Sequence, residues 1–539
     1  VLGIRQIWLH ALAGVLSAYG MGLANLRVEQ QKSVDVALND EEINILRDVI
    51  AELTLSCDEM LAAQIVPAEN RNFVVQLGMR VPGTDTVLVV DYGTADEVQR
   101  DFRAVYLRRY GAAYDGDGLV IATVRVAATG AEQAFSEPEL AHSDAANSIA
   151  TSPMWVDGGW LDVPVYIRVE FGSCAALWGP ALVIEQNATT VVDAGWRGVI
   201  GRTGHLLLER DATDAGDSAQ TTGDEQPDPV KLEVFNRLFM HLAEQMGTVL
   251  QNTALSVNIR ERLDFSCALF DQEGRLVSNA PHMPVHLGSM GESVRSVIAA
   301  KGAELRDGDA IMLNSPYNGG THLPDITVVT PWYAGSDRPM FYLASRAHHA
   351  DIGGISPGSM PSNSTSIEQE GILIDNFYLV RAGELQMESV RELFADSKYP
   401  ARNPEQNIAD LNAQLAANQQ GIRQLEKTID RYGLPLVQSY LRFVRINAAT
   451  SVRRLLGSLH DGSFCYELDS GEKIQVQITV DHENARAHVD FSGTSPQSAS
   501  NFNAPEAVTR AAVLYVFRSR SSADIPLTDG VLDPLETPI

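Results

Sequence analysis

Cysteine is scarce in this sequence. Its 539 residues include only four, Cys57, Cys174, Cys267 and Cys465, and no CxxC pair occurs. Such scattered cysteines exclude a disulfide framework and a thiolate zinc site, and they favour a reducing, cytoplasmic setting. Cys57 and Cys267 lie among apolar residues, so we expect both to be small core residues rather than nucleophiles.

Basic residues are also few. Lys and Arg total 41 against 69 Asp and Glu, which gives a net charge of -28 with His neutral. A chain this acidic repels phosphate backbones, and it has no basic stripe interleaved with aromatic residues. We therefore expect no nucleic-acid partner.

The sequence also lacks an internal repeat, a Walker A motif and a GxGxxG motif. Residues 6–26 carry no formal charge, but their glycines and polar side chains make membrane insertion unfavourable. We expect a buried helix and turn there, and no membrane partner. Because the chain starts at Val1 without Met and ends at Ile539 just after a strand-like run, we expect it to be an internal piece of a longer protein.

The composition that is present is that of an ordinary globular protein, with 45% hydrophobic and 20% charged residues. Residues 66–208 contain short runs of alternating apolar residues, which predict a mainly β module. Residues 211–229 hold six acidic residues and no Lys or Arg, so we expect an acidic linker at 209–229. A larger unit is expected from residue 230 onward.

Two strong helix starts lie beyond the linker. Asp228 and Asn403 can each cap a helix whose first position is proline. The apolar stripe after Asn403 could form a seam with a partner helix, but packing on its own domain is favoured. Together these patterns predict a mixed α/β (α+β) fold, with a β-rich module followed by a larger α/β domain.

The densest group of polar side chains spans residues 314–325 and 346–354. Two strand-like runs and a turn near Ser336 separate these segments, which predicts a β-hairpin. An antiparallel register centred near Ser336 would place Asp325 opposite Ala347 and His322 opposite Ala350. The His and Asp side chains would then meet at one end of the hairpin.

This combination of imidazole and carboxylate suits zinc, manganese, iron or cobalt. Because strand side chains alternate, His348 and His349 should face opposite ways, so only one is expected to be a ligand. The other would contact substrate or support the ligands. The alternative is a hydrogen-bonded polar cluster at a strand end without a metal.

Two further segments could bind substrate. Arg260, Arg262 and Asp264 form a charged group just before a strand, which fits either an ion-pair network or anion binding. His282 and His286 lie near a glycine-rich stretch, residues 288–291, that we expect to be a turn. They fit either structural histidines or carboxylate binding.

Two short sequences imitate the phosphate loop of actin-like ATPases. They are Asp91 to Thr94, after a strand, and Asp351 to Gly354. Such a loop binds phosphate with glycine N–H groups, but a four-residue match is a weak signal. Neither is expected to be an ATP site.

Several segments resemble one known family. The resemblance is to the B half of 5-oxoprolinases, hydantoinases and acetone carboxylases, and to the late part of their A half. The B-half segments are residues 254–268, 279–290, 319–325, 348–354, 404–411, 490–494 and 501–505, and the A-half segments are residues 10–24, 179–181 and 189–192. A and B halves in one chain resemble 5-oxoprolinase more than the two-gene members.

The resemblance implies a domain order. Residues 1–65 would be the tail of the actin-like ATPase region of the A half, and 66–208 its β-rich C-terminal module. Residues 209–229 would be the acidic linker and 230–539 a hydantoinase B/oxoprolinase domain, truncated at its C-terminus. ATP with magnesium would bind upstream of the present chain, so we expect this fragment alone to be inactive.

The resemblance also implies an activity, which is ATP-dependent opening of the lactam of 5-oxo-L-proline to L-glutamate. Its metal ligands would be His322, Asp325 and His348, holding zinc, manganese or iron. His349 and Asp351 would be catalytic, in proton transfer or in supporting the ligands. Arg260, Arg262, Asp264, His282 and His286 would bind the small-molecule substrate, 5-oxoproline or a related cyclic amide. The alternatives are a hydantoinase, an acetone-carboxylase-like enzyme or a non-catalytic scaffold, and we expect a homo-oligomer.

Overall fold

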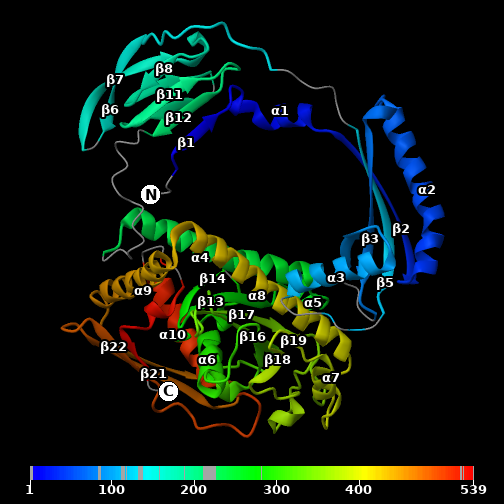
Figure 1. The fold of residues 1–539 in the computed structure, drawn as a ribbon. Helices are drawn as coiled ribbons and strands as arrows, with labels where there is room; N and C mark the ends of the chain where they lie inside the picture. The colour runs from blue at the N-terminus through cyan, green and yellow to red at the C-terminus, as the bar shows by residue number, and fades with distance from the viewer. Residues whose placement is uncertain are drawn as a thin grey trace. The chain divides into compact units, whose positions relative to one another are not determined.

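The computed structural model describes most of the chain in two units (Figure 1). One unit comprises Val1–Ser33, Asn44–Gln76 and Val124–Gln220, and the other Val34–Ile43, Leu77–Thr123 and Thr221–Ile539. The described residues are 4–82, 87–110, 114, 116, 118–130, 137–156, 158–186, 188–210, 226–280, 282–521, 525 and 527–537. Most of the expected linker, residues 211–225, lies outside them.

The first unit contains two four-stranded sheets, in the orders β1-β12-β11-β8 and β10-β9-β7-β6. Buried apolar residues such as Leu177, Val183 and Leu206 form one core with members on both sheets. Residues 150–210 are therefore mainly strand, as the alternation predicted, but the expected module at 66–208 is not one unit, because Leu77–Thr123 belongs to the other unit and includes a helix at Ala95–Tyr110. Its strands are β1 (Gln6–Leu9), β6 (Ala150–Val156), β7 (Gly159–Ile167), β8 (Ala176–Trp178), β9 (Ala181–Ile184), β10 (Thr189–Val192), β11 (Trp196–Ile200) and β12 (Leu206–Arg210).

The uncharged segment at residues 6–26 forms β1, a short 3-10 turn and helix α1 (Leu16–Leu23). The expectation that it is buried is wrong for the described chain, because no residue of α1 is buried and Met21 is 80% exposed. The helix connects β1 to β2 (Leu26–Ala37) and is not part of a packed layer. Among the described residues, none of the helices combines the length and the apolar character needed to cross a membrane.

Strand β2 belongs to a further four-stranded sheet in the order β2-β5-β3-β4. Its other strands are β3 (Arg71–Arg80), β4 (Leu88–Asp91) and β5 (Val120–Gly130), and its helices are α2 (Asp40–Ala63) and α3 (Ala95–Tyr110). Cys57 is fully buried on α2, which confirms its place in a core.

The second unit is built on a seven-stranded sheet in the order β14-β13-β17-β16-β15-β18-β19. Every adjacent pair in it is antiparallel. Helices α4 (Pro229–Thr253) and α8 (Pro404–Tyr432) cover one face, and α6 (Pro284–Lys301) covers the other (Figure 1). The strands are β13 (Phe265–Asp271), β14 (Leu276–Asn279), β15 (Ala310–Leu313), β16 (Asp325–Trp332), β17 (Phe341–His348), β18 (Phe377–Arg381) and β19 (Glu384–Leu385).

Both predicted helix starts are confirmed. The Asp228 carboxylate accepts hydrogen bonds from the Val230 and Lys231 N–H groups, and Pro229 opens α4. The Asn403 side chain accepts from Gln406 N–H, and Pro404 opens α8. The apolar stripe of α8 is buried in the cores of its own unit, as favoured over a partner seam.

Smaller elements complete the unit. Helix α9 (Leu434–Leu456) follows α8, and α10 (Glu506–Arg520) packs on α6. A last sheet, β20 (Gly462–Glu467), β21 (Lys473–Asp481), β22 (Arg486–Asp490) and β23 (Leu535–Glu536), shares a core with α9 and α10. The remaining helices are α5 (Val257–Arg260) and α7 (Met387–Ala395). The mixed α/β class is confirmed.

Alternation along the central strands decides which side chains meet. Cys267 on β13 and Leu343 on β17 belong to the core under α4 and α8, whereas their neighbours Ala268 and Ala344 belong to the core under α6. Even-numbered residues of these two strands therefore face α6. The same rule places odd-numbered residues of β16 on the α6 face, as Val329 shows.

Candidate metal centre

The predicted hairpin exists, but its register is shifted by one residue. Asp325 pairs with His348, not with Ala347, and Trp332 pairs with Phe341. The connection is residues 333–340, an even number, so the hairpin centre falls between Ser336 and Asp337 rather than on Ser336. The shift brings Asp325 and His348 directly opposite each other on the α6 face.

A third strand extends this row. Phe265 pairs with Ala347 on the other side of β17, so Asp264 lies opposite His348 as well. The His348 N–H donates to the Asp264 carbonyl over 3.0 Å. Three neighbouring strands thus align Asp264, His348 and Asp325 at one end of the sheet.

His322 approaches this row from the loop before β16. Its Nδ1 lies 3.0 Å from Asp325 Oδ2. His348 Nδ1 lies 3.5 Å from Asp325 Oδ1 and 3.4 Å from Asp264 Oδ2. The Asp325 side chain is 1% exposed and that of His322 is 37% exposed. The centre is therefore buried on the Asp325 side and partly exposed to solvent on the His322 side. We call these four residues the Asp325 cluster.

The nitrogen and oxygen atoms of the cluster point toward one another, but two of them form no hydrogen bond in the described chain. Within the described residues, the buried His322 Nδ1 and Asp325 Oδ1 have no hydrogen-bond partner. Leaving buried polar atoms unpaired costs about 1–3 kcal/mol each. Two imidazole nitrogens and carboxylate oxygens with free lone pairs are a donor set that fits a divalent transition metal.

Asp325 is held in place by groups behind it. Its Oδ2 accepts a hydrogen bond from Thr321 Oγ1 over 2.5 Å and lies 3.1 Å from His286 Nε2. Burial alone would raise the Asp325 pKa, but the bond from His286 and the neighbouring His322 outweigh it and hold the pKa well below its usual range. The carboxylate is therefore ionised and fixed in orientation.

His286 has a different place from the one expected. Residues 288–291 are part of helix α6, not a turn, because Gly288 lets the helix pack closely on α10: a Cβ there would lie 2.5 Å from Ala511 Cα. The fully buried imidazole lies 3.0 Å from Ser266 Oγ on its other side. It supports Asp325 from behind and is not brought to a substrate-accessible surface.

His282 is likewise a buried support. Its Nδ1 accepts a hydrogen bond from the Cys267 N–H over 3.2 Å, and its ring packs on Phe265. Burial lowers the His282 pKa to about 4. Cys267 is fully buried, as expected, and burial raises its pKa. Neither side chain is presented to substrate.

The neutral state of His282 predicts a loss of stability in acid. Its pKa is about 4 when folded and about 6.5 when unfolded, so the unfolded chain binds more protons between these values and stability falls as pH falls. Relative to His282→Gln, the wild-type free energy of unfolding should drop by about 1.4 kcal/mol from pH 7.5 to pH 5.5. Urea unfolding at both pH values measures this, and a pH-independent difference between the two proteins would contradict it.

His349 points away from the cluster, as alternation predicted. It is fully buried, with Nε2 3.1 Å from Gln414 Oε1 and Nδ1 3.2 Å from Asn407 Nδ2. Both partners lie on α8. Since Asn407 donates to one ring nitrogen and the other donates to Gln414, neither nitrogen is available for proton transfer at the cluster.

Asp351 is also engaged elsewhere. Its carboxylate accepts hydrogen bonds from the N–H groups of Gly353, Gly358 and Arg402, and it pairs with the Arg402 guanidinium at 2.7 Å. Gly354 N–H donates to the Tyr399 carbonyl. The carboxylate thus stabilises the loop that it belongs to. The glycine N–H groups are occupied, so this is not a phosphate-binding loop.

The other imitation of a phosphate loop is a helix cap. Thr94 N–H and Oγ1 both donate to the Glu97 carboxylate, at 2.9 and 3.0 Å. This closes the first turn of α3, which begins at Ala95. The Thr94 and Glu97 side chains of this segment thus serve as a helix cap.

Arg260 is the last residue of α5, and Arg262 lies on the turn that leads from α5 to Asp264. Both are exposed, and neither guanidinium forms an ion pair within the described part of the chain. The structure therefore does not support the ion-pair network that the sequence analysis offered as one interpretation of these two arginines. It leaves two free cations a few residues from a cluster carboxylate, where they could bind an anion.

Sequence reasoning missed three members of the site. It assigned Asp264 to substrate, although the aligned row places it beside His348, and it gave no role to Thr321 or Arg346. The position of Asp264 could have indicated its place. It comes directly before β13, just as His348 is the last residue of β17. Only the pairing of these two strands connects them.

A second group of histidines and a carboxylate lies in the first unit, but its atoms are satisfied. His10 Nε2 and His205 Nε2 lie 3.3 and 2.9 Å from the Glu137 carboxylate. Their Nδ1 atoms accept the N–H groups of Leu12 and Ala11. Both rings therefore carry their proton on Nε2 and donate it to Glu137, which disfavours a metal. Hydrogen bonding from Tyr19 is the main cause of the lowered Glu137 pKa.

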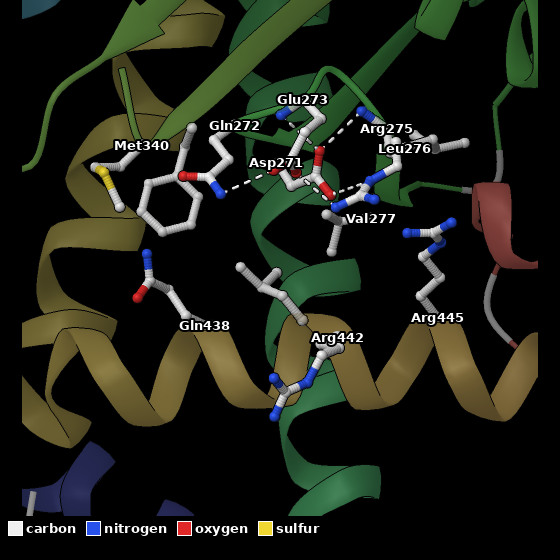
Figure 2. A pocket seen from close by; sticks show the side chains of 12 residues that line it. Asp271, Gln272, Glu273, Arg275, Leu276, Val277, Met340, Gln438, Arg442 and Arg445 are labelled. Atoms are coloured by element: carbon white, nitrogen blue, oxygen red, sulfur yellow. Dashed lines mark hydrogen bonds and ion pairs between the residues drawn. The ribbon is translucent and has the colours of Figure 1, made fainter. Parts of the chain in front are cut away.

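A separate pocket lies at the opposite end of β13, between the β13–β14 turn and α9 (Figure 2). It has a volume of about 260 Å³. Most of its charged groups are paired. Arg275 binds Asp271 at 2.7 Å and Glu273 at 2.5 Å, and Arg445 binds Asp533 at 2.7 Å, whereas Arg442 lies over the Phe443 ring. The pocket has no converging free donor atoms comparable to those of the Asp325 cluster.

Comparison with known proteins points to one family. The sequence profile described as Hydantoinase B/oxoprolinase matches residues 228–539. The chain is 36% identical to 5-oxoprolinase 1 of Arabidopsis thaliana, over 99% of this chain and 44% of that protein. It is 34% identical to a 5-oxoprolinase of Saccharomyces cerevisiae, over 99% of this chain and 44% of that one. The chain thus spans less than half the length of these relatives.

A solved structure also matches. The ATP-dependent caprolactamase of Pseudomonas jessenii superposes with a TM-score of 0.53 at 26% identity, covering 58% of this chain and 54% of that one. More than half of this chain therefore shares its fold with that structure.

Proposed function

The chain belongs to the hydantoinase B/oxoprolinase family, and on this premise we propose that the intact protein opens the lactam of 5-oxo-L-proline to L-glutamate with hydrolysis of ATP. The observation that carries the proposal is the Asp325 cluster. Donor atoms of His322, Asp325 and His348 lie within 4.8 Å of one another, and two of its atoms, His322 Nδ1 and Asp325 Oδ1, have no hydrogen-bond partner among the described residues. The chain's identity to 5-oxoprolinases over nearly all of its length supports the choice of substrate.

The chemistry explains why ATP is needed. An amide is stabilised by resonance, and phosphorylation of the lactam oxygen would give an imidate that water attacks readily. We propose that ATP with magnesium binds outside residues 230–539, in the part of the enzyme that resembles the A half. Residues 1–65 and 66–208 would be its last segments.

His322, Asp325, His348 and Asp264 would hold a zinc, manganese or iron ion. When bound, such a metal polarises a carbonyl oxygen or lowers the pKa of a bound water. His286 and Thr321 keep the Asp325 carboxylate ionised and oriented. Arg260 and Arg262 would bind the substrate carboxylate. In this arrangement His349 has a structural role through its hydrogen bonds to α8. Asp351 has one through its hydrogen bonds within the 351–359 loop.

The test is a coupled assay on the intact protein. ADP and glutamate should appear in equal amounts with 5-oxoproline, and neither should appear when Asp325 is replaced. Turnover of hydantoins or ketones without 5-oxoproline cleavage would instead favour a hydantoinase or acetone-carboxylase-like activity. Absence of turnover with all of these substrates would favour a scaffold. The homo-oligomeric state stays a prediction.

A further inference from the structure

A fully buried arginine lies beneath the Asp325 cluster. Arg346 is two residues before His348 on β17, on the same α6 face, and its side chain has 0% exposure. Within the described chain, no Asp or Glu forms an ion pair with it. An arginine guanidinium carries its positive charge at neutral pH. Burying a charge without an ion-pair partner is costly unless hydrogen bonds stabilise it.

The guanidinium is held by neutral oxygens from three separate elements. Nε donates to Thr327 Oγ1 of β16 over 2.7 Å. The terminal nitrogens donate to Ser289 Oγ and Ser293 Oγ of α6, at 2.5 and 2.8 Å. One of them also donates to the Gly319 carbonyl over 2.9 Å. Four N–H groups are thus used in one plane, which a lysine ammonium cannot reproduce.

Gly319 belongs to the loop that carries Thr321 and His322. Its φ is +83°, and a Cβ there would lie 2.2 Å from Ser293 N, so the loop lies directly against α6 where it binds Arg346. Arg346 therefore connects the two strands that carry Asp325 and His348 to the loop that carries His322.

We propose that Arg346 is a positioning residue of the metal centre, whose planar guanidinium fixes the residue 314–324 loop so that His322 can act as a ligand. This role rests on the proposed metal site. The positive charge also interacts favourably with the Asp325 carboxylate, in a region of low dielectric where charges interact strongly. The effect of the planar hydrogen-bonding geometry can be measured separately from the effect of the charge. The Arg346→Lys variant keeps the positive charge but cannot form the same set of hydrogen bonds.

The test uses cobalt(II) in the intact protein, since its visible spectrum reports the number and type of ligands. Wild type should bind one cobalt. Arg346→Lys should bind it about 10–100-fold more weakly, the usual cost of losing a group that supports metal ligands. Its visible bands should change in the same direction as those of His322→Ala. Arg295→Lys, on α6 but paired with Glu292 and Asp529, is the matched control and should leave both readouts unchanged.

The outcomes separate the two proposals. Cobalt binding by wild type together with an unchanged spectrum and affinity in Arg346→Lys overturns the role of Arg346 and leaves the metal site standing. No cobalt binding by wild type overturns both. If Arg346→Lys does not fold, the Thr327→Val and Ser293→Ala variants decide. Each removes one hydrogen bond from the guanidinium, and both should weaken cobalt binding if the role is correct.

Discussion

Replacing Asp325 with asparagine should lower kcat/KM for 5-oxoproline by at least about 10³-fold, the order expected when a principal electrostatic group of an active site is removed. Asp325 faces both candidate imidazole ligands and accepts hydrogen bonds from Thr321 and His286. Asparagine keeps the shape but removes the negative charge and one acceptor. Coupled measurement of ADP and glutamate with the purified variant gives the ratio.

Asp271→Asn is the matched control. Asp271 lies at the far end of β13 in the same sheet and pairs with Arg275 at 2.7 Å. Because it faces the separate pocket, its replacement should change kcat/KM by less than about threefold. Circular dichroism establishes that both variants fold. Near wild-type turnover in folded Asp325→Asn would remove the cluster from the mechanism.

Replacing Asn314 with alanine should destabilise the second unit by about 4 kcal/mol, since each buried group left unsatisfied costs about 1–3 kcal/mol. Asn314 is fully buried at the start of the loop that leads to His322. Its Nδ2 donates to the carbonyls of Leu323 and Ile372, at 2.8 and 2.9 Å. Its Oδ1 accepts from the Ile374 N–H at 2.7 Å. The variant would leave three backbone groups without partners.

Asn318→Ala provides the comparison four residues along the same loop. The Asn318 side chain makes one hydrogen bond, to Asp375 at 2.7 Å, at an exposed position. Its loss should cost less than about 1 kcal/mol. Urea unfolding of both variants measures the difference, and similar midpoints for Asn314→Ala and wild type would show that the loop is held by other contacts.

Local patterns were sufficient for the elements that carry the site. The cap residues Asp228 and Asn403 located two helix starts, and two strand-like runs on either side of a turn located β16 and β17. The opposite directions of His348 and His349 followed from strand geometry alone. These features depend on residues close together in the sequence, where the physical rules are strongest.

Features that depend on distant residues were not accessible. The register differed by one because loop length, not strand pattern, sets the centre of the hairpin. His349 was assigned to catalysis because nothing near it in sequence indicates its bond to Gln414 on α8. Asp351 similarly pairs with Arg402, and residues 288–291 lie in α6, where Gly288 packs closely on α10.

Elemental analysis of the intact wild-type protein, purified without added metal or chelator, tests the central claim most directly. The account predicts close to one equivalent of zinc, manganese, iron or cobalt per chain, and loss of that equivalent in a variant with His322, Asp325 and His348 all replaced by alanine. Wild-type protein that hydrolyses 5-oxoproline with ATP while holding no stoichiometric transition metal would contradict it.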